Sequence, residues 1–263
     1  MAVRLRDWRD DLLFAQDFLI RCEYFMLAQN IMFSRRLPEP PGIAQFRDKA
    51  ELFISRHKAV AVVELLIMAA LFAVPFFTFS SGILGISFVL LMLWLRKSSI
   101  RYLGLRRSSS WLKTVLRGVT AMIIILTVQG LLVQPLLRHL FPQPPNFSRF
   151  HNMNSYQLLG WIAAGWVMGG FTEEIIRAYL LYRIVELVGG TRAGWICAVL
   201  GSSFFYALNH RYQGFAGAIG VIVSCIGFGF LYLASKRNLW SNIICHGLND
   251  TLALIAVFLG TLS

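Results

Sequence analysis

The most informative stretch of the sequence is Phe171-Thr172-Glu173-Glu174-Ile175-Ile176-Arg177, which sets two adjacent carboxylates and an arginine inside an apolar segment that runs from residue 156 to about 188. Beyond Arg96 the chain has only four acidic residues, Glu173, Glu174, Glu186 and Asp250. A charged side chain at bilayer depth costs several kcal/mol unless it is paired or solvated. A chain with so few acids that still places two of them side by side is therefore expected to use them.

The composition is that of a membrane protein. Of the 263 residues, 57% are hydrophobic and 14% are charged, and the mean hydropathy is +0.61. Soluble domains carry about 25% charged residues. The net charge of +12 comes from basic segments that alternate with apolar spans, which is the positive-inside pattern of membrane proteins. We therefore expect a lipid bilayer around most of the chain and no nucleic-acid partner.

The apolar segments predict an all-α, polytopic bundle of about seven or eight transmembrane helices. Glu64 is the one acid of the first span, and we expect it to pair with an arginine or lysine near the interface. The segment 156–188 is too long for one span, and Gly169-Gly170 offers a break within it. The other expected spans are 59–79, 80–95, 119–137, 193–209, 214–235 and 240–261.

Two domains are expected, a basic amphipathic segment over 1–58 and a transmembrane helical domain over 59–263. Within the first, residues 12–33 predict an amphipathic helix in the membrane interface, the alternative being a first spanning helix broken by internal charges. Ten lysines and arginines in 1–58 and seven in 96–117 place both segments on the cytoplasmic side. We expect a multi-pass integral membrane protein, of a bacterial inner membrane, with a cytoplasmic N-terminus.

The carboxylate pair is a candidate general base. On a regular α-helix Glu173 and Arg177 share a face and can form an ion pair, whereas Glu174 points about 100° away. Two like charges this close cannot both ionise freely in a low dielectric unless the arginine compensates, and such a carboxyl group suits proton transfer near neutral pH. The alternative is a buried ion pair that only holds helices in register.

Two histidines complete the set of polar residues at bilayer depth. His210 follows Tyr206 by one helical turn and is also compatible with a plain interfacial position at a helix end. His246 is followed by Asn249 and Asp250 at helical spacings of three and four, so that an imidazole and a carboxylate or amide share one face. Such a face could orient a base, donate to an oxyanion or bind a metal.

Taken together, these segments resemble the three signature blocks of the CPBP family, the CAAX proteases and bacteriocin-processing enzymes also called Abi, which are membrane-embedded endopeptidases. The family pattern is a Glu-Glu pair followed by Arg, an aromatic residue four positions before a His, and a His with Asn or Asp four positions on. The resemblance covers about residues 156–255, and a stretch like Leu103-Gly104-Leu105 is also common in the family. The matching residues are Glu173, Glu174 and Arg177, Tyr206 and His210, and His246 and Asp250.

Two departures from the pattern stand out. Three residues usually separate the second Glu from the Arg, and here only two separate Glu174 from Arg177. Aligning on the arginine makes Glu173 the second Glu of the pattern and puts Thr172 in the position of the first. The sequence therefore leaves open which glutamate takes the leading catalytic role. Tyr206 stands where the family prefers Phe, and its hydroxyl needs a partner.

The resemblance implies peptide hydrolysis by a glutamate-activated water near the membrane. Glu173 or Glu174 would take the proton, His210 would help to hold the water, His246 with Asp250 or Asn249 would stabilise the oxyanion, and Arg177 would fix the carboxylates. We expect no cofactor, with a zinc site on Glu173, His210 and His246 as an alternative. The expected substrate is a peptide or a membrane protein.

Two other functions stay open at this point. A non-catalytic scaffold or regulator of a partner membrane protein, built on the same fold, is favoured by the short spacing between Glu174 and Arg177. A transporter is a third hypothesis, because intramembrane acids can carry protons, although the charged residues gather at one expected site and do not line a path. The oligomeric state is not predicted.

Overall fold

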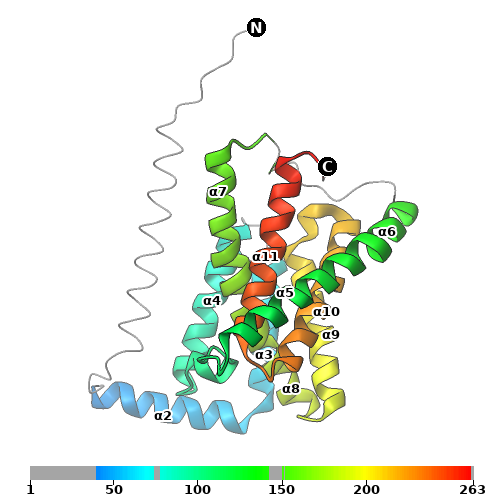
Figure 1. Ribbon diagram of the computed structural model, residues 1–263. Coiled ribbons are helices and arrows are strands. Elements are labelled where there is room, and N and C mark those ends of the chain that lie inside the picture. The colour runs from blue at the N-terminus through cyan, green and yellow to red at the C-terminus, as the bar shows by residue number, and fades with distance from the viewer. Residues whose placement is uncertain (1–39, 74–77, 142–149, 151, 262–263) are drawn as a thin grey trace.

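The computed structural model describes residues 40–73, 78–141, 150 and 152–261 (Figure 1). Over these residues the chain is helical and contains no strand, which confirms the all-α prediction. The amphipathic helix expected at 12–33 lies outside the described residues. The helices are α2 (Pro41–Arg56), α3 (Lys58–Ala73), α4 (Thr78–Leu95), α5 (Trp111–Val128), α6 (Gln134–Leu140), α7 (Ser155–Ala164), α8 (Glu174–Val188), α9 (Arg192–Asn209), α10 (Gly214–Ala234) and α11 (Leu239–Phe258).

Short segments of other helical types connect or interrupt these helices. The 3-10 turns are η1 (Ile100–Leu103) and η5 (Arg211–Gln213), and the wider π-helical segments are η2 (Gln129–Val133) and η4 (Gly165–Glu173). Through η2, helices α5 and α6 form one long run that crosses the bundle obliquely (Figure 1).

Three helical runs of the described chain are long and apolar enough to cross a membrane by length and composition: Trp111–Leu140, Arg211–Ala234 and Leu239–Phe258. Ser81–Leu95 is apolar but shorter. Helix α8 carries Glu174, Arg177, Arg183 and Glu186 and is correspondingly more polar. The total of seven or eight spans stays a prediction.

Helix α2 lies across one end of the bundle, at a steep angle to α3 and α4 (Figure 1). Pro41 occupies its first turn, where a missing N–H costs nothing. One face is anchored, because Ile54 is buried and Arg47 Nε donates to the Trp94 carbonyl over 3.2 Å. Phe46 and Phe53 are exposed, so the helix has an apolar flank beside the bundle.

The break expected at Gly169-Gly170 does not occur. Helices α7 and α8 are joined without interruption through the π-helical segment η4, in which both glycines lie buried. Glycines on both sides of this contact allow close packing. A Cβ on Gly170 of η4 would come within 3.1 Å of the Ile243 carbonyl, and a Cβ on Gly247 of α11 would come within 2.6 Å of the Trp166 ring. The small residues let η4 and α11 approach each other without a break in the helix.

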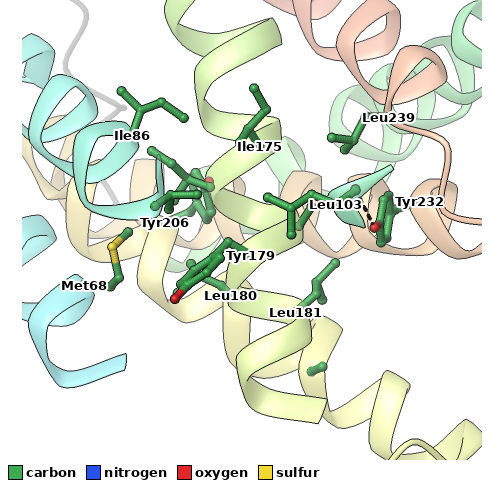
Figure 2. Packing of buried hydrophobic residues seen from close by; sticks show 14 of the residues in the cluster. Met68, Ile86, Leu103, Ile175, Tyr179, Leu180, Leu181, Tyr206, Tyr232 and Leu239 are labelled. Atoms are coloured by element: carbon green, nitrogen blue, oxygen red, sulfur yellow. Dashed lines mark hydrogen bonds between the residues drawn. The ribbon is translucent and has the colours of Figure 1, made fainter. Parts of the chain in front are cut away.

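Helix α8 forms the centre of the core. Ile175, Tyr179, Leu180 and Leu181 are fully buried and pack among residues of α3, α4 and α9 such as Tyr206 (Figure 2). Residues 174–181 are buried without a gap, so the first half of the helix is buried on all sides and not along one stripe.

A buried charge network ties α3 and α4 to α8. Glu64 is paired with Arg96 over 2.7 Å, which confirms the expected pairing. The Tyr179 hydroxyl donates to the other oxygen of Glu64 over 2.7 Å. Arg183 lies 3.8 Å from Glu64 and 2.6 Å from Glu186. Each charge therefore has a partner inside the bundle.

The stretch Leu103-Gly104-Leu105 fixes the start of α11. Gly104 has a φ of +100°, and its carbonyl accepts the backbone N–H of Leu239 over 3.1 Å. The Tyr232 hydroxyl donates to the Leu103 carbonyl over 2.8 Å (Figure 2). A side chain at position 104 would collide with the Arg237 carbonyl, so glycine is required here for both its conformation and its size.

Candidate active site

Glu174, the first residue of α8, lies at the centre of the polar cluster. It is fully buried, and both carboxylate oxygens are engaged. Arg177 Nε lies 3.1 Å from Oε1 and 3.2 Å from Oε2, Nδ1 of His246 lies 2.8 Å from Oε1, and Nδ2 of Asn242 donates to Oε2 over 3.0 Å. The carboxylate is thus held by α8 itself and by α11.

The ion pair expected between Glu173 and Arg177 is not formed, because Arg177 pairs with Glu174. The expectation assumed a regular α-helix through both residues, whereas Glu173 is the last residue of the π-helical segment. His246 and Asn242 also fix the Glu174 carboxylate, and the guanidinium joins that group. Its plane lies over the Tyr206 ring, with 4.1 Å between the guanidinium carbon and the ring centroid, a favourable cation–π contact.

Glu173 has a different environment from its neighbour. It is only half-buried, and within the described part of the chain its carboxylate takes part in no hydrogen bond. Its backbone carbonyl accepts the Tyr206 hydroxyl over 2.5 Å, which answers the need of that hydroxyl for a partner. The Glu173 side chain is close enough to His246 and Asp250 to interact electrostatically with both. Of the two carboxylates, Glu173 is the uncommitted one.

His246 lies between two carboxylates. Its Nδ1 faces Glu174, and its Nε2 lies 3.6 Å from Oδ1 of Asp250, one turn further along α11. The Phe228 ring of α10 stacks on the imidazole with a centroid separation of 4.6 Å. Asn249 lies beside Asp250 and interacts with its carboxylate. The ring orientation is therefore fixed from three sides.

Gly169 of η4 makes room for this arrangement. A Cβ at this position would overlap Oδ2 of Asp250 and would come within 3.3 Å of Nε2 of His246. The π-helical segment thus brings backbone, and not a side chain, against the Nε2 edge of the imidazole.

His210 caps the end of α9, next to the same cluster. Its Nδ1 lies 2.9 Å from the Tyr206 carbonyl, which leaves Nε2 available. His210 interacts electrostatically with Asp250 and His246. Direct contacts therefore link Glu174, Arg177, His246 and Asp250, while Glu173, His210 and Asn249 lie at the margin of the same cluster.

The residues named for a zinc site are not grouped as metal ligands. Among the described residues, no set of three or more His, Cys, Asp or Glu side chains is arranged to hold a metal ion. Glu173, His210 and His246 therefore do not fit the zinc alternative, and we derive no step through a metal.

Two residues of the cluster were missed from the sequence. Asn242 is fully buried and contacts Glu174, yet it belongs to none of the three blocks. A signal was present, because Asn242 precedes His246 by four positions on α11 and so shares its face. Phe228 was also missed, since an aromatic residue in an apolar helix gives no such signal.

The comparisons with known proteins agree with these motifs. Residues 155–252 match the family model described as type II CAAX prenyl endopeptidase Rce1-like. No match was found among curated proteins or among solved structures. The matched region contains all the residues of the cluster described above, and the apolar helices together with this match identify an integral membrane protein. Over residues 155–252 the chain thus matches the CAAX protease family, as its three motifs predicted.

Proposed function

We propose that the protein is an intramembrane endopeptidase in which Glu173 activates the attacking water. The observation that supports this choice is the different engagement of the two glutamates. Glu174 has both oxygens bound by Arg177, Asn242 and His246, so it is poorly placed to take a proton from a water. Glu173 is uncommitted and interacts electrostatically with His246 and Asp250, so its carboxylate is free to accept a proton from a water.

The proposed reaction needs no covalent intermediate. Glu173 removes a proton from a water held with the help of Nε2 of His210, and the water oxygen adds to the scissile carbonyl carbon. The resulting oxyanion is stabilised by a proton on Nε2 of His246, which Glu174 and Asp250 favour by flanking both ring nitrogens. Collapse of the tetrahedral intermediate breaks the C–N bond, and Glu173 returns the proton to the leaving amine.

The proposed substrate is a peptide at the membrane surface, with a prenylated CAAX tail as the first candidate. This proposal rests on the description of the matching family. Another peptide or a membrane protein is the alternative substrate. Comparing the cleavage of different probes distinguishes these substrates.

The test uses the full chain in liposomes with three probes: a farnesylated CAAX peptide, the same peptide without the farnesyl group, and a transmembrane peptide. Glu173→Gln is expected to lower kcat by about 100-fold or more, as loss of a general base does. In water labelled with oxygen-18, mass spectrometry should find one labelled oxygen in the new carboxylate. Full activity of Glu173→Gln would contradict the assignment of the base.

A non-catalytic scaffold is the second candidate. It is favoured by one observation, the short spacing between Glu174 and Arg177, which departs from the pattern of the catalytic family. If no probe is cleaved and a membrane protein co-purifies with the wild type, the scaffold is the better interpretation.

A further inference from the structure

Asn242 is a buried polar residue of the cluster that the proposed reaction does not use. It lies one turn into α11, and its side chain is fully shielded. A buried amide costs free energy unless its polar atoms are hydrogen-bonded. An apolar side chain would carry no such cost, so the amide calls for an explanation.

Both N–H groups of the amide are committed. Nδ2 donates to Oε2 of Glu174 over 3.0 Å and to the Phe228 carbonyl of α10 over 2.8 Å. Two acceptors on one side identify the nitrogen, because the amide oxygen would repel both. Oδ1 has no hydrogen-bond partner among the described residues. The orientation of the amide is thus set by its two donated bonds alone.

The Glu174 carboxylate depends on this donor. Arg177 gives it one N–H, shared between the two oxygens at 3.1 and 3.2 Å, so the arginine alone does not fix the rotation of the carboxylate. Asn242 binds Oε2, and the remaining oxygen then faces Nδ1 of His246 at 2.8 Å. Without Asn242 the carboxylate could turn about its terminal bond, which has a broad torsional preference.

We propose that Asn242 is a positioning residue, which locks the Glu174 carboxylate so that it holds Nδ1 of His246 and turns Nε2 towards Asp250 and the scissile bond. The effect on catalysis rests on the proposed function, whereas the effect on the imidazole does not. Asn242 and His246 are four residues apart on α11, and Phe228 serves both, through its carbonyl and its ring. Three helices thereby fix one imidazole.

The first measurement is kinetic, with the farnesylated CAAX peptide as the probe. Asn242→Leu keeps the branched shape of the side chain and removes both donated bonds. We expect kcat to fall by about 10- to 100-fold, the usual effect of losing a hydrogen bond to a charged group, and KM to stay unchanged because Asn242 touches no substrate. In a Glu174→Gln background the same substitution should have little further effect on kcat, since residues that act as a unit are not additive.

The matched control is Asn238→Leu, at the asparagine that forms the N-cap of α11. The Asn238 side chain caps the helix by accepting the N–H of Trp240 over 3.1 Å and contacts no residue of the cluster. Its loss should lower the thermal stability in detergent and leave kcat per folded molecule unchanged. A merely structural role of Asn242 would give that same result for Asn242→Leu, so the kinetic comparison separates the two roles.

The second measurement needs no activity. Nitrogen-15 spectra of histidine-labelled protein, assigned with a His246→Ala variant, report the tautomer and hydrogen bonding of His246. Asn242→Leu should shift the His246 signals towards those of Glu174→Gln, while Asn238→Leu should leave them in place. If Asn242→Leu does not fold, Asn242→Ser, whose hydroxyl is too short to reach both acceptors, should give the same shift.

The outcomes are distinct. Unchanged kcat and unchanged imidazole signals in the Asn242 variant would overturn the proposal, as would an equal loss of kcat in the Glu174→Gln background. If the wild type cleaves none of the probes, the proposed function fails, and the imidazole spectra still decide the role of Asn242.

Discussion

At the scale of residues, the cluster is defined by how each polar atom is satisfied. Glu173 and Glu174 are identical in chemistry and adjacent in sequence, and the sequence left open which of them leads. The structure distinguishes them because α11 supplies donors to Glu174 only. The sequence could predict that the polar residues of the three blocks would gather, but it paired Arg177 with Glu173, whereas the structure pairs it with Glu174. It could not predict which oxygen faces which donor, because that depends on the relative rotation of α8 and α11.

A glycine provides a sharp test at this scale. Gly169→Ala places a methyl group against Oδ2 of Asp250 and within 3.3 Å of Nε2 of His246. Because catalysis is sensitive to displacements of about 1 Å, we expect kcat to fall by about 100-fold. The measurement is the cleavage rate of the farnesylated peptide per folded molecule.

The control is Gly160→Ala in α7, where a new Cβ meets no atom within 4 Å. Both glycines belong to the same helical run, so both substitutions favour the helix equally. Equal activity of the two variants would mean that the contact with Asp250 and His246 is unimportant.

At the scale of elements, the sequence predicted the later helices well. The expected spans 193–209, 214–235 and 240–261 correspond closely to α9, α10 and α11. Helix α5 begins at Trp111, well before the expected 119, because Ser110 caps it inside the basic segment. The break expected at Gly169-Gly170 was wrong, since glycine in a tightly packed membrane helix serves close approach as often as flexibility.

The loop before α5 gives a prediction for these elements. Gly104→Ala combines a φ of +100° with a collision against the Arg237 carbonyl, and a strained residue costs about 1–3 kcal/mol. The start of α11 should move, and the melting temperature in detergent should fall.

Gly214→Ala is the comparison, because Gly214 also has a positive φ, of +79°, but no atom within 4 Å of a new Cβ. Gly214→Ala should lower the melting temperature by less than Gly104→Ala does. Similar losses of stability in both variants would show that backbone conformation alone, and not the contact between the loop and α11, determines the effect.

At the scale of the whole molecule, two polar clusters lie along α8 with different tasks. Glu174 and Arg177 belong to the candidate active site, while Arg183 and Glu186 join Glu64 and Arg96 at the other end of the helix. The sequence predicted the partner type of Glu64 but not the participation of Tyr179. A long-range contact of this kind follows from the packing of α3 on α8, which no local pattern encodes.

A substitution in the second cluster is predicted to lower the stability of the protein and to leave its activity unchanged. Glu64→Gln leaves Arg96 and Arg183 short of a counter-charge in a buried position, and breaking a buried pair costs about 3–5 kcal/mol. We expect a clearly lower melting temperature in detergent and an unchanged kcat per folded molecule. Asp48→Asn, which removes an exposed partner of Lys97, should change stability by less than about 1 kcal/mol. A loss of kcat in Glu64→Gln would connect the two clusters.

The π-helical segment η4 has a consequence for how such chains are detected. Its turns hold more residues than α-helical turns, so a count of positions does not translate into a fixed angle around the axis. Directly after this segment, two residues and not three separate Glu174 from Arg177. A search pattern with rigid spacing would reject this chain, although its arginine reaches a carboxylate over 3.1 Å. Patterns that tolerate one inserted or deleted residue beside the glycine pair should recover further proteins with the same cluster.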